Sequence, residues 1–100
     1  MPTFEVTPRF ARDFARLSPD QQRRFRRVIV EHFVPDVEAG SFRPGLRVKG
    51  VQAAAGVYEM TWAPDGRATW QYGEEKTAGT PHVVWRRIGT HGIFTPPPGP

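Results

Sequence analysis

Four basic side chains in the last third of the chain have the chemistry to hold and cleave a phosphodiester. Arg67 follows a turn, Arg86 and Arg87 lie on a later apolar strand, and His91 comes just past that strand. Histidine exchanges protons near neutral pH, and arginine binds phosphate through planar, bidentate hydrogen bonds. Cleaving RNA without a metal needs a base for the ribose 2′-hydroxyl, an acid for the leaving 5′-oxygen and cations for the phosphate. His91 is therefore a candidate for proton transfer, and Arg67 for holding the phosphate.

Two further cations, Arg47 and Lys49, come earlier in the chain. If residues 46–50 are extended, both side chains point to one face, because strand residues two apart share a face. We expect Lys49 to join the catalytic group at the phosphate and Arg47 to bind RNA beside Arg86 and Arg87. The alternative is a basic sheet that only binds a partner.

Tyr72 is the aromatic candidate for RNA binding at the end of a predicted strand. It has the same parity as Ala68 and Trp70, which should face the helices, whereas Arg67 and Gln71 lie on the opposite, polar face. Strict alternation therefore favours a core position for Tyr72, unless the strand end or a bulge turns it to the surface.

The remaining histidines do not suggest a metal site. His32 fits the apolar face of a helix, and His82 opens a strand with no partner that the sequence identifies. Cysteine is absent, and three widely spaced histidines do not form a zinc motif. We assign neither a metal nor a cofactor to this chain.

The elements that must position these residues begin with a strand and two helices. Thr7-Pro8 and Ser18-Pro19 are helix-start signals, the second with Gln21 as a capping-box partner. A longer helix begins at Pro19, and Pro35 and Gly40 should close it. The other expected elements are a strand at residues 3–6, a helix at 8–17, and strands at 57–62, 67–72 and 82–88, with a hairpin turn at 63–66.

This order predicts an α+β domain, in which an N-terminal strand and a helical hairpin pack on a mostly antiparallel four-stranded sheet. The second face of the sheet is then free to bind a partner. We expect a single domain over residues 1–94, followed by a disordered, Pro-rich tail at 95–100.

Composition indicates an anionic partner. The 100 residues carry a net charge of +4, and nearly all the cations are arginine. A GC-rich coding sequence is an alternative reason for choosing arginine over lysine, but it explains the net charge less well. No signal peptide and no apolar run long enough for a membrane span is present, so we expect a cytoplasmic protein with no membrane partner.

Taken together, these segments resemble the RelE/ParE superfamily of toxins from bacterial type II toxin–antitoxin systems. The resemblance covers residues 3–94 and rests on order and spacing. The matching pieces are residues 4–8, 14–18, 19–22, 46–50 and 57–60, the turn with Arg67, and residues 87–91.

The resemblance implies a RelE-like fold, a cognate antitoxin and one of two targets. RelE-like members cleave mRNA in the ribosomal A site without a metal, whereas ParE-like members poison DNA gyrase and are not nucleases. By position, Lys49, Arg67 and His91 match phosphate-binding or catalytic residues of the ribonuclease branch. Phe94 and, less directly, Tyr72 are the candidates for an aromatic residue that the family often has near this end.

We expect a ribosome-dependent, metal-independent mRNA endoribonuclease that inhibits translation, with the ribosome, mRNA and an antitoxin as partners. One alternative is a gyrase-directed toxin without nuclease activity. Another is a non-toxic relative that only binds its partner.

Overall fold

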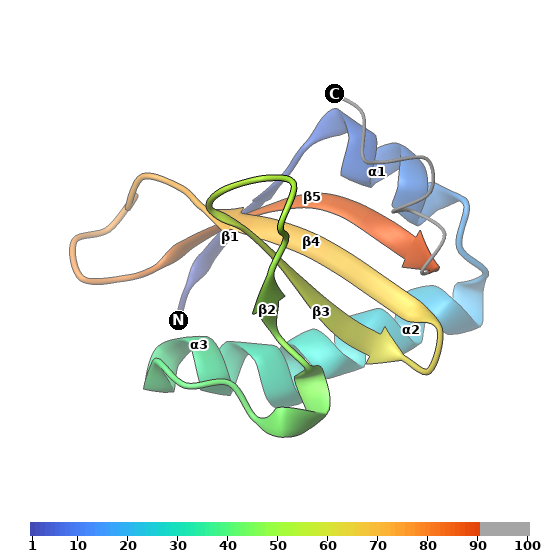
Figure 1. Cartoon of the computed structure of the whole chain (residues 1–100), viewed down its shortest axis with the longest axis horizontal. Coiled ribbons are helices and arrows are strands. Elements are labelled where there is room, and N and C mark those ends of the chain that lie inside the picture. Colours follow the sequence, from blue (N-terminus) through green and yellow to red (C-terminus); the bar gives the residue numbers. More distant parts are fainter. Residues whose placement is uncertain (91–100) are drawn as a thin grey trace.

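A five-stranded sheet with helices along one face makes up residues 1–90, the part of the chain that the computed structural model describes (Figure 1). This is the predicted α+β arrangement. The expectations for His91, Phe94 and the Pro-rich tail lie outside the described residues. In chain order the elements are β1 (Thr3–Val6), α1 (Pro8–Ala15), α2 (Pro19–Val28), the π-helical turn η1 (Ile29–Phe33), α3 (Val34–Ala39), the 3-10 turn η2 (Pro44–Leu46), β2 (Lys49–Gly50), β3 (Val57–Ala63), β4 (Gly66–Tyr72) and β5 (His82–Thr90).

Both predicted helix starts are present. The Thr7 hydroxyl accepts a hydrogen bond from the Phe10 N–H at 3.1 Å, and Ser18 and Gln21 form a reciprocal capping box. Each helix has proline at its first position, where the missing N–H would have no partner within the helix. The Thr7 cap lies between β1 and α1, and the Ser18 cap lies at the turn between α1 and α2.

The second helix continues past Pro35, where the sequence predicts its end. In the π-helical turn before it, the N–H of Val34 bonds to the carbonyl of Ile29, and Gly40 ends α3 in the left-handed region at φ 75°. Proline lacks an N–H and its ring crowds the carbonyl four residues back. The wider π turn relieves that conflict, so Gly40 alone closes the helix. None of the helices within residues 1–90 has the length and apolar content needed to cross a membrane.

The sheet has the strand order β1-β5-β4-β3-β2. Strands β2 to β5 form the antiparallel, four-stranded part that the sequence predicts. The N-terminal strand also joins the sheet, because β1 pairs in parallel with β5 and becomes one edge. The opposite edge of the sheet is β2.

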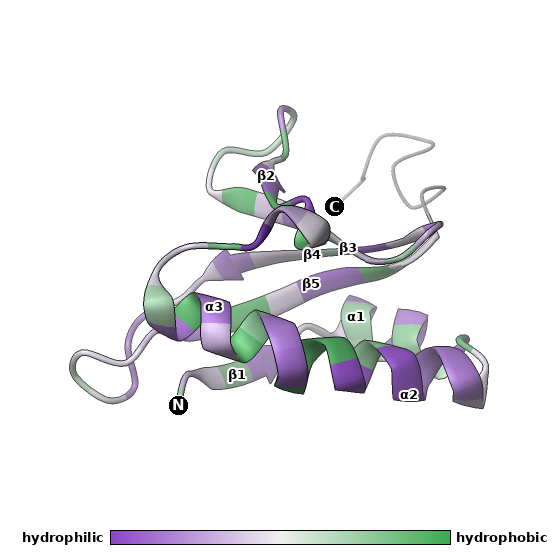
Figure 2. Cartoon of the chain, turned by 90° about the horizontal axis from the view of Figure 1, so that it is seen from below, coloured by the Kyte–Doolittle hydropathy of each residue, from purple (hydrophilic) through white to green (hydrophobic). Residues whose placement is uncertain are grey.

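Aromatic rings fill the layer between the sheet and the helices. The ring centroid of Phe33 lies 5.0 Å from that of Trp70 and 4.9 Å from that of Trp85. The centroids of the Phe25 and Trp85 rings are 5.4 Å apart. Figure 2 shows α1, α2 and α3 together on one side of the sheet, with β2 curling away on the other side. The helix-covered face is therefore the core, and polar chemistry is left to the other face.

Candidate functional site

A basic hollow lies on the face of the sheet that the helices do not cover. Its volume is about 440 Å³, and its walls come from β2, β3, β4 and the two residues between η2 and β2. The lining residues are Arg47, Val48, Lys49, Glu59, Thr61 and Arg67. Three cations that the sequence predicts for one site are thus gathered in one place, and we call it the basic hollow.

Strand pairing brings these side chains together. In the register of the sheet, Lys49 lies opposite Glu59, and Thr61 lies opposite Arg67. Residues opposite each other in an antiparallel pair put their side chains on the same face, about 5 Å apart. The aromatic residues of β3 and β4 take the alternate positions, which keeps the polar set away from the core.

Glu59 is a site residue that we did not assign from the sequence. Its carboxylate lies 3.2 Å from Lys49 Nζ, and its side chain is only 14% exposed, against 72% for Lys49. The sequence signal was available, because Glu59 has the parity of the polar face. A carboxylate inside a cationic hollow can accept a proton, while the flexible ammonium beside it remains open to solvent.

Arg67 is held by the turn that precedes it. Its Nη1 donates to the carbonyl of Gly66 at 3.0 Å and to that of Pro64 at 3.4 Å. The other guanidinium nitrogens make no hydrogen bond to any described residue, so they can donate to a bound anion. The Arg67 carbonyl accepts from the Trp62 indole N–H at 3.1 Å, which ties the backbone to the core.

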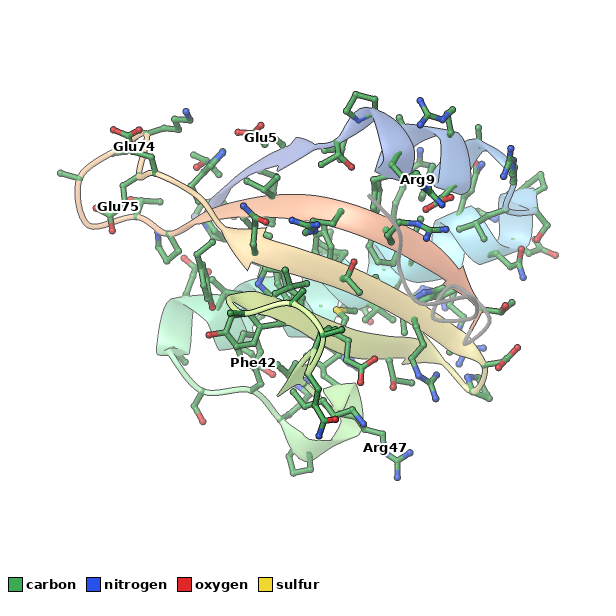
Figure 3. The ribbon with its side chains drawn as sticks, turned by 45° about the horizontal axis from the view of Figure 1, so that its top comes forward. Glu5, Arg9, Phe42, Arg47, Glu74 and Glu75 are labelled. Atoms are coloured by element: carbon green, nitrogen blue, oxygen red, sulfur yellow. The ribbon has the colours of Figure 1, made fainter. Side chains whose placement is uncertain are left out.

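Arg47 adopts a left-handed backbone conformation. Its φ is 50°, the one positive φ of a non-glycine residue within residues 1–90. We expected residues 46–50 to be extended, but the stretch before Lys49 is not. The 3-10 turn η2 and the left-handed backbone of Arg47 place this residue on the rim of the hollow. Figure 3 shows the Arg47 side chain reaching away from the ribbon. Non-glycine residues in such a conformation are strained by roughly 1 kcal/mol and concentrate at functional sites.

Arg86 lies on the polar face outside the hollow. A register shift between Thr69 and Trp70 makes Arg86 the extra, bulged residue of β5. Its Nη1 donates to Gln71 Oε1 at 2.6 Å, and the side chain is exposed. It can serve as a peripheral contact for an extended anion.

Arg87 is held by Asp13 of α1. Its Nε donates to Asp13 Oδ2 at 2.8 Å, and the same oxygen accepts the N–H of Ile88 at 3.3 Å. The side chains of Arg87 and Asp13 are 19% and 8% exposed. β1 ends before this part of β5, so no neighbouring strand accepts the N–H of Ile88 at the sheet edge. The Asp13 carboxylate accepts it instead. This geometry gives Arg87 a structural role.

Tyr72 lies at the end of β4, and its side chain is exposed by 45%. Its ring meets the Tyr58 ring edge-on at 5.9 Å, and Tyr58 stacks on Trp70. Partial burial, with a smaller effect of Tyr58, raises the pKa of Tyr72. Tyr72 thus lies on the core face of the sheet, but it is partly exposed because it is at the strand end. This face is opposite to the one that carries the basic hollow.

His82 has two partners that the sequence did not reveal. Its Nδ1 lies 2.7 Å from the Thr3 hydroxyl, and its Nε2 lies 2.6 Å from Glu5 Oε1. His82 is 4% exposed, and its hydrogen bond lowers the pKa of Glu5. Glu5 lies outermost on β1 in Figure 3. This network joins the parallel strands β1 and β5, far along the chain from each other, and is structural.

No group of three histidine, aspartate or glutamate side chains within residues 1–90 is arranged to hold a metal ion. The lining of the basic hollow offers three cations, one carboxylate and one hydroxyl.

Comparison with solved structures identifies the architecture. The chain is similar to a copper-bound mutant toxin from Helicobacter pylori, with a TM-score of 0.66 at 12% identity over 94% of this chain and 99% of that one. The chain has a RelE-like fold. It is also similar to a chain of the Escherichia coli DinJ–YafQ toxin–antitoxin complex (TM-score 0.65, 11% identity, 93% and 96% covered).

A third similar structure is a chain of the RelB–RelE antitoxin–toxin complex from Methanococcus jannaschii, with a TM-score of 0.60 at 12% identity, covering 91% of this chain and 94% of that one. No protein-family model matches the sequence, and no curated protein matches it. The fold implied by the resemblance is confirmed, and it places the basic hollow on the uncovered face of a RelE-like sheet.

Proposed function

We propose that this chain is the toxin of a type II toxin–antitoxin system and a ribosome-dependent, metal-independent mRNA endoribonuclease. The observation that carries the proposal is the basic hollow, whose lining includes Arg47, Lys49 and Arg67, with the Glu59 carboxylate paired to Lys49. Cations positioned for a phosphate that gains charge in the transition state are the main requirement of such a reaction. The similar chains from the DinJ–YafQ and RelB–RelE complexes support a cognate antitoxin as partner.

The proposed reaction is attack of a ribose 2′-hydroxyl on the adjacent phosphorus. The 2′-oxygen–phosphorus bond forms and the phosphorus–5′-oxygen bond breaks, which leaves a 2′,3′-cyclic phosphate and a 5′-hydroxyl. Arg67 and Lys49 hold the non-bridging phosphate oxygens. Glu59 takes the 2′-hydroxyl proton, and His91 gives a proton to the leaving 5′-oxygen.

Thr90, the last residue that the structure describes, lies opposite Gly66 in the β4–β5 register. Arg47 and Arg86 are outlying contacts for the RNA backbone, on either side of the hollow.

The ribosome supplies the remaining precision, because holding the RNA in an in-line geometry is worth orders of magnitude in rate. The test is primer extension on mRNA recovered from translating ribosomes after addition of the purified chain. We expect new 5′ ends at codons in the A site, and little cutting of the same mRNA without ribosomes. Growth arrest without new ends, together with loss of DNA supercoiling activity, would instead identify a gyrase-directed toxin. Expression without any growth effect would identify a non-toxic relative.

A further inference from the structure

Thr61 lines the basic hollow and takes no part in the proposed reaction. It belongs to β3, which pairs with β2 on one side and with β4 on the other (Figure 1). Its side chain is partly buried, and its hydroxyl makes no hydrogen bond to any residue within 1–90. The hollow therefore contains one hydroxyl that is free to donate to a ligand.

The register of the sheet puts charged residues of the hollow on both sides of Thr61. Arg67 lies opposite it on β4. On the β2 side, Lys49 lies opposite Glu59, which is two residues before Thr61 and therefore on the same face. Opposite residues in such pairs have Cβ atoms about 5 Å apart, and diagonal ones about 7 Å apart. An anion held between Arg67 and Lys49 therefore lies across Thr61.

A threonine suits this place because it offers a donor that is already well positioned. Its branched side chain has a restricted χ1 angle, whereas the long side chains of Lys49 and Arg67 lose more rotamer freedom when a ligand fixes them. The hydroxyl can still rotate to follow a phosphate oxygen. Thr69, which lies opposite Glu59 on β4, differs because it is only 5% exposed and does not line the hollow.

We propose that Thr61 is a phosphate ligand, whose hydroxyl donates to one non-bridging oxygen of the phosphodiester that Arg67 and Lys49 hold from either side. The hydrogen bond strengthens as that oxygen gains charge during attack of the 2′-hydroxyl, so Thr61 stabilises the transition state more than the bound RNA. Glu59 remains the proton acceptor, and Thr61 keeps its own proton. Only the catalytic part of this role rests on the proposed function.

Single-turnover cleavage on ribosomes, with the full chain, compares three variants. Thr61→Val removes the hydroxyl but keeps the branched shape, and it should slow cleavage about tenfold to a hundredfold at unchanged ribosome affinity. Thr61→Ser retains the donor and should stay within about threefold of the wild type. Thr69→Val is the matched control, because it removes a hydroxyl from the same polar face outside the hollow, and it should cleave at the wild-type rate. Thermal unfolding verifies that each variant is folded.

A phosphorothioate at the cut site distinguishes a phosphate ligand from a residue that only shapes the strand. Sulfur accepts hydrogen bonds weakly, so replacing the oxygen that Thr61 contacts should slow the wild type. The same replacement should slow Thr61→Val much less, because the hydrogen bond is already absent. Both phosphorothioate isomers are compared, since Thr61 contacts one of the two oxygens. Equal slowing of the wild type and Thr61→Val by both isomers would overturn the proposal.

Binding of a 2′-deoxyribose dinucleotide tests the site without cleavage, because this probe has a phosphodiester but no 2′-hydroxyl. An NMR titration should place the Thr61 amide among the largest shifts, and Thr61→Val should weaken binding about threefold to tenfold, the size expected for one hydrogen bond. No binding, shifts confined to residues outside the hollow, or equal affinities of Thr61→Val and Thr69→Val would overturn the proposal. The expected binding without any cleavage on ribosomes would reject the nuclease and leave Thr61 as a phosphate ligand.

Discussion

Arg67 and Arg87 lie on neighbouring strands and have the same side chain, yet the structure gives them different roles. Arg87 is bound by the Asp13 carboxylate and is mostly buried, whereas Arg67, among residues 1–90, bonds to two turn carbonyls and faces the basic hollow. Arg43 resembles Arg87, because Asp36 accepts from it at 2.9 and 3.0 Å. The difference teaches that a guanidinium bound by a carboxylate of the fold has few donors left for a ligand. Lys49 differs from Arg87, because its ammonium is 72% exposed and keeps donors beyond its single contact with Glu59.

Removal of the guanidinium at position 67 is expected to have the largest effect. Arg67→Ala should slow cleavage on ribosomes about a thousandfold, the size of effect that follows loss of a main transition-state donor. Its free energy of unfolding should change by only about 0.5 kcal/mol, as for most surface changes. A slow variant that is also strongly destabilised would place Arg67 in the same structural class as Arg87.

Asp13→Ala should have the opposite profile. It leaves Arg87 and the N–H of Ile88 without an acceptor in a mostly buried place, which should cost about 3 kcal/mol of stability. Urea unfolding measures this loss, while the cleavage rate of the folded fraction should stay near that of the wild type. A stable Asp13→Ala protein would show that the pairing at the β5 edge is dispensable.

Lys49→Gln and Glu59→Gln sharpen the comparison inside the hollow. Each should slow single-turnover cleavage about tenfold to a hundredfold, because a phosphate contact or a proton acceptor is lost. Neither should destabilise the fold by more than about 1 kcal/mol, since Lys49 is exposed. A Glu59→Gln protein that cleaves at the wild-type rate would exclude Glu59 as the base.

Arg47→Gly tests the strained rim residue. Glycine accepts a positive φ, so the variant should be as stable as the wild type or about 1 kcal/mol more stable. Its affinity for ribosomes should fall, with a smaller dependence on salt, because one phosphate contact is lost. Unchanged ribosome affinity would remove Arg47 from the RNA-binding surface.

The smallest effect is expected at low pH, from Asp36. Hydrogen bonds from Arg43 lower its pKa from 3.8 to about 2. A carboxyl with a lowered folded-state pKa stabilises the fold above its unfolded-state pKa, and that contribution is lost as the pH falls from about 4 towards 2. The pH dependence of unfolding in this window should be weaker in Asp36→Asn than in the wild type.

Local signals predict much of this fold. Thr7, Ser18 and the prolines after them mark the two helix starts, and alternation around the turn before Arg67 marks β3 and β4. The same alternation correctly separates Glu59 and Thr61 from the aromatic core face. These features depend on residues close together in the chain, so one sequence contains them.

The remaining features depend on partners far apart in the chain. Asp13 meets Arg87, and Glu5 meets His82, only after β1 and α1 have docked on β5. The π turn before Pro35 and the left-handed conformation of Arg47 likewise result from packing, and no local sequence pattern predicts them. The sequence therefore predicts which cations are present, but not which of them pair with carboxylates of the fold.

Cleavage of an mRNA with a single 2′-deoxynucleotide at the cut site tests the central claim most directly. Ribosomes programmed with this mRNA, or with its all-ribose form, are mixed with an excess of the chain, and the products are resolved by primer extension. The account predicts cutting of the all-ribose mRNA to a 2′,3′-cyclic phosphate and no cutting at the deoxy position. Equal cutting of both, or no cutting of either, would contradict it.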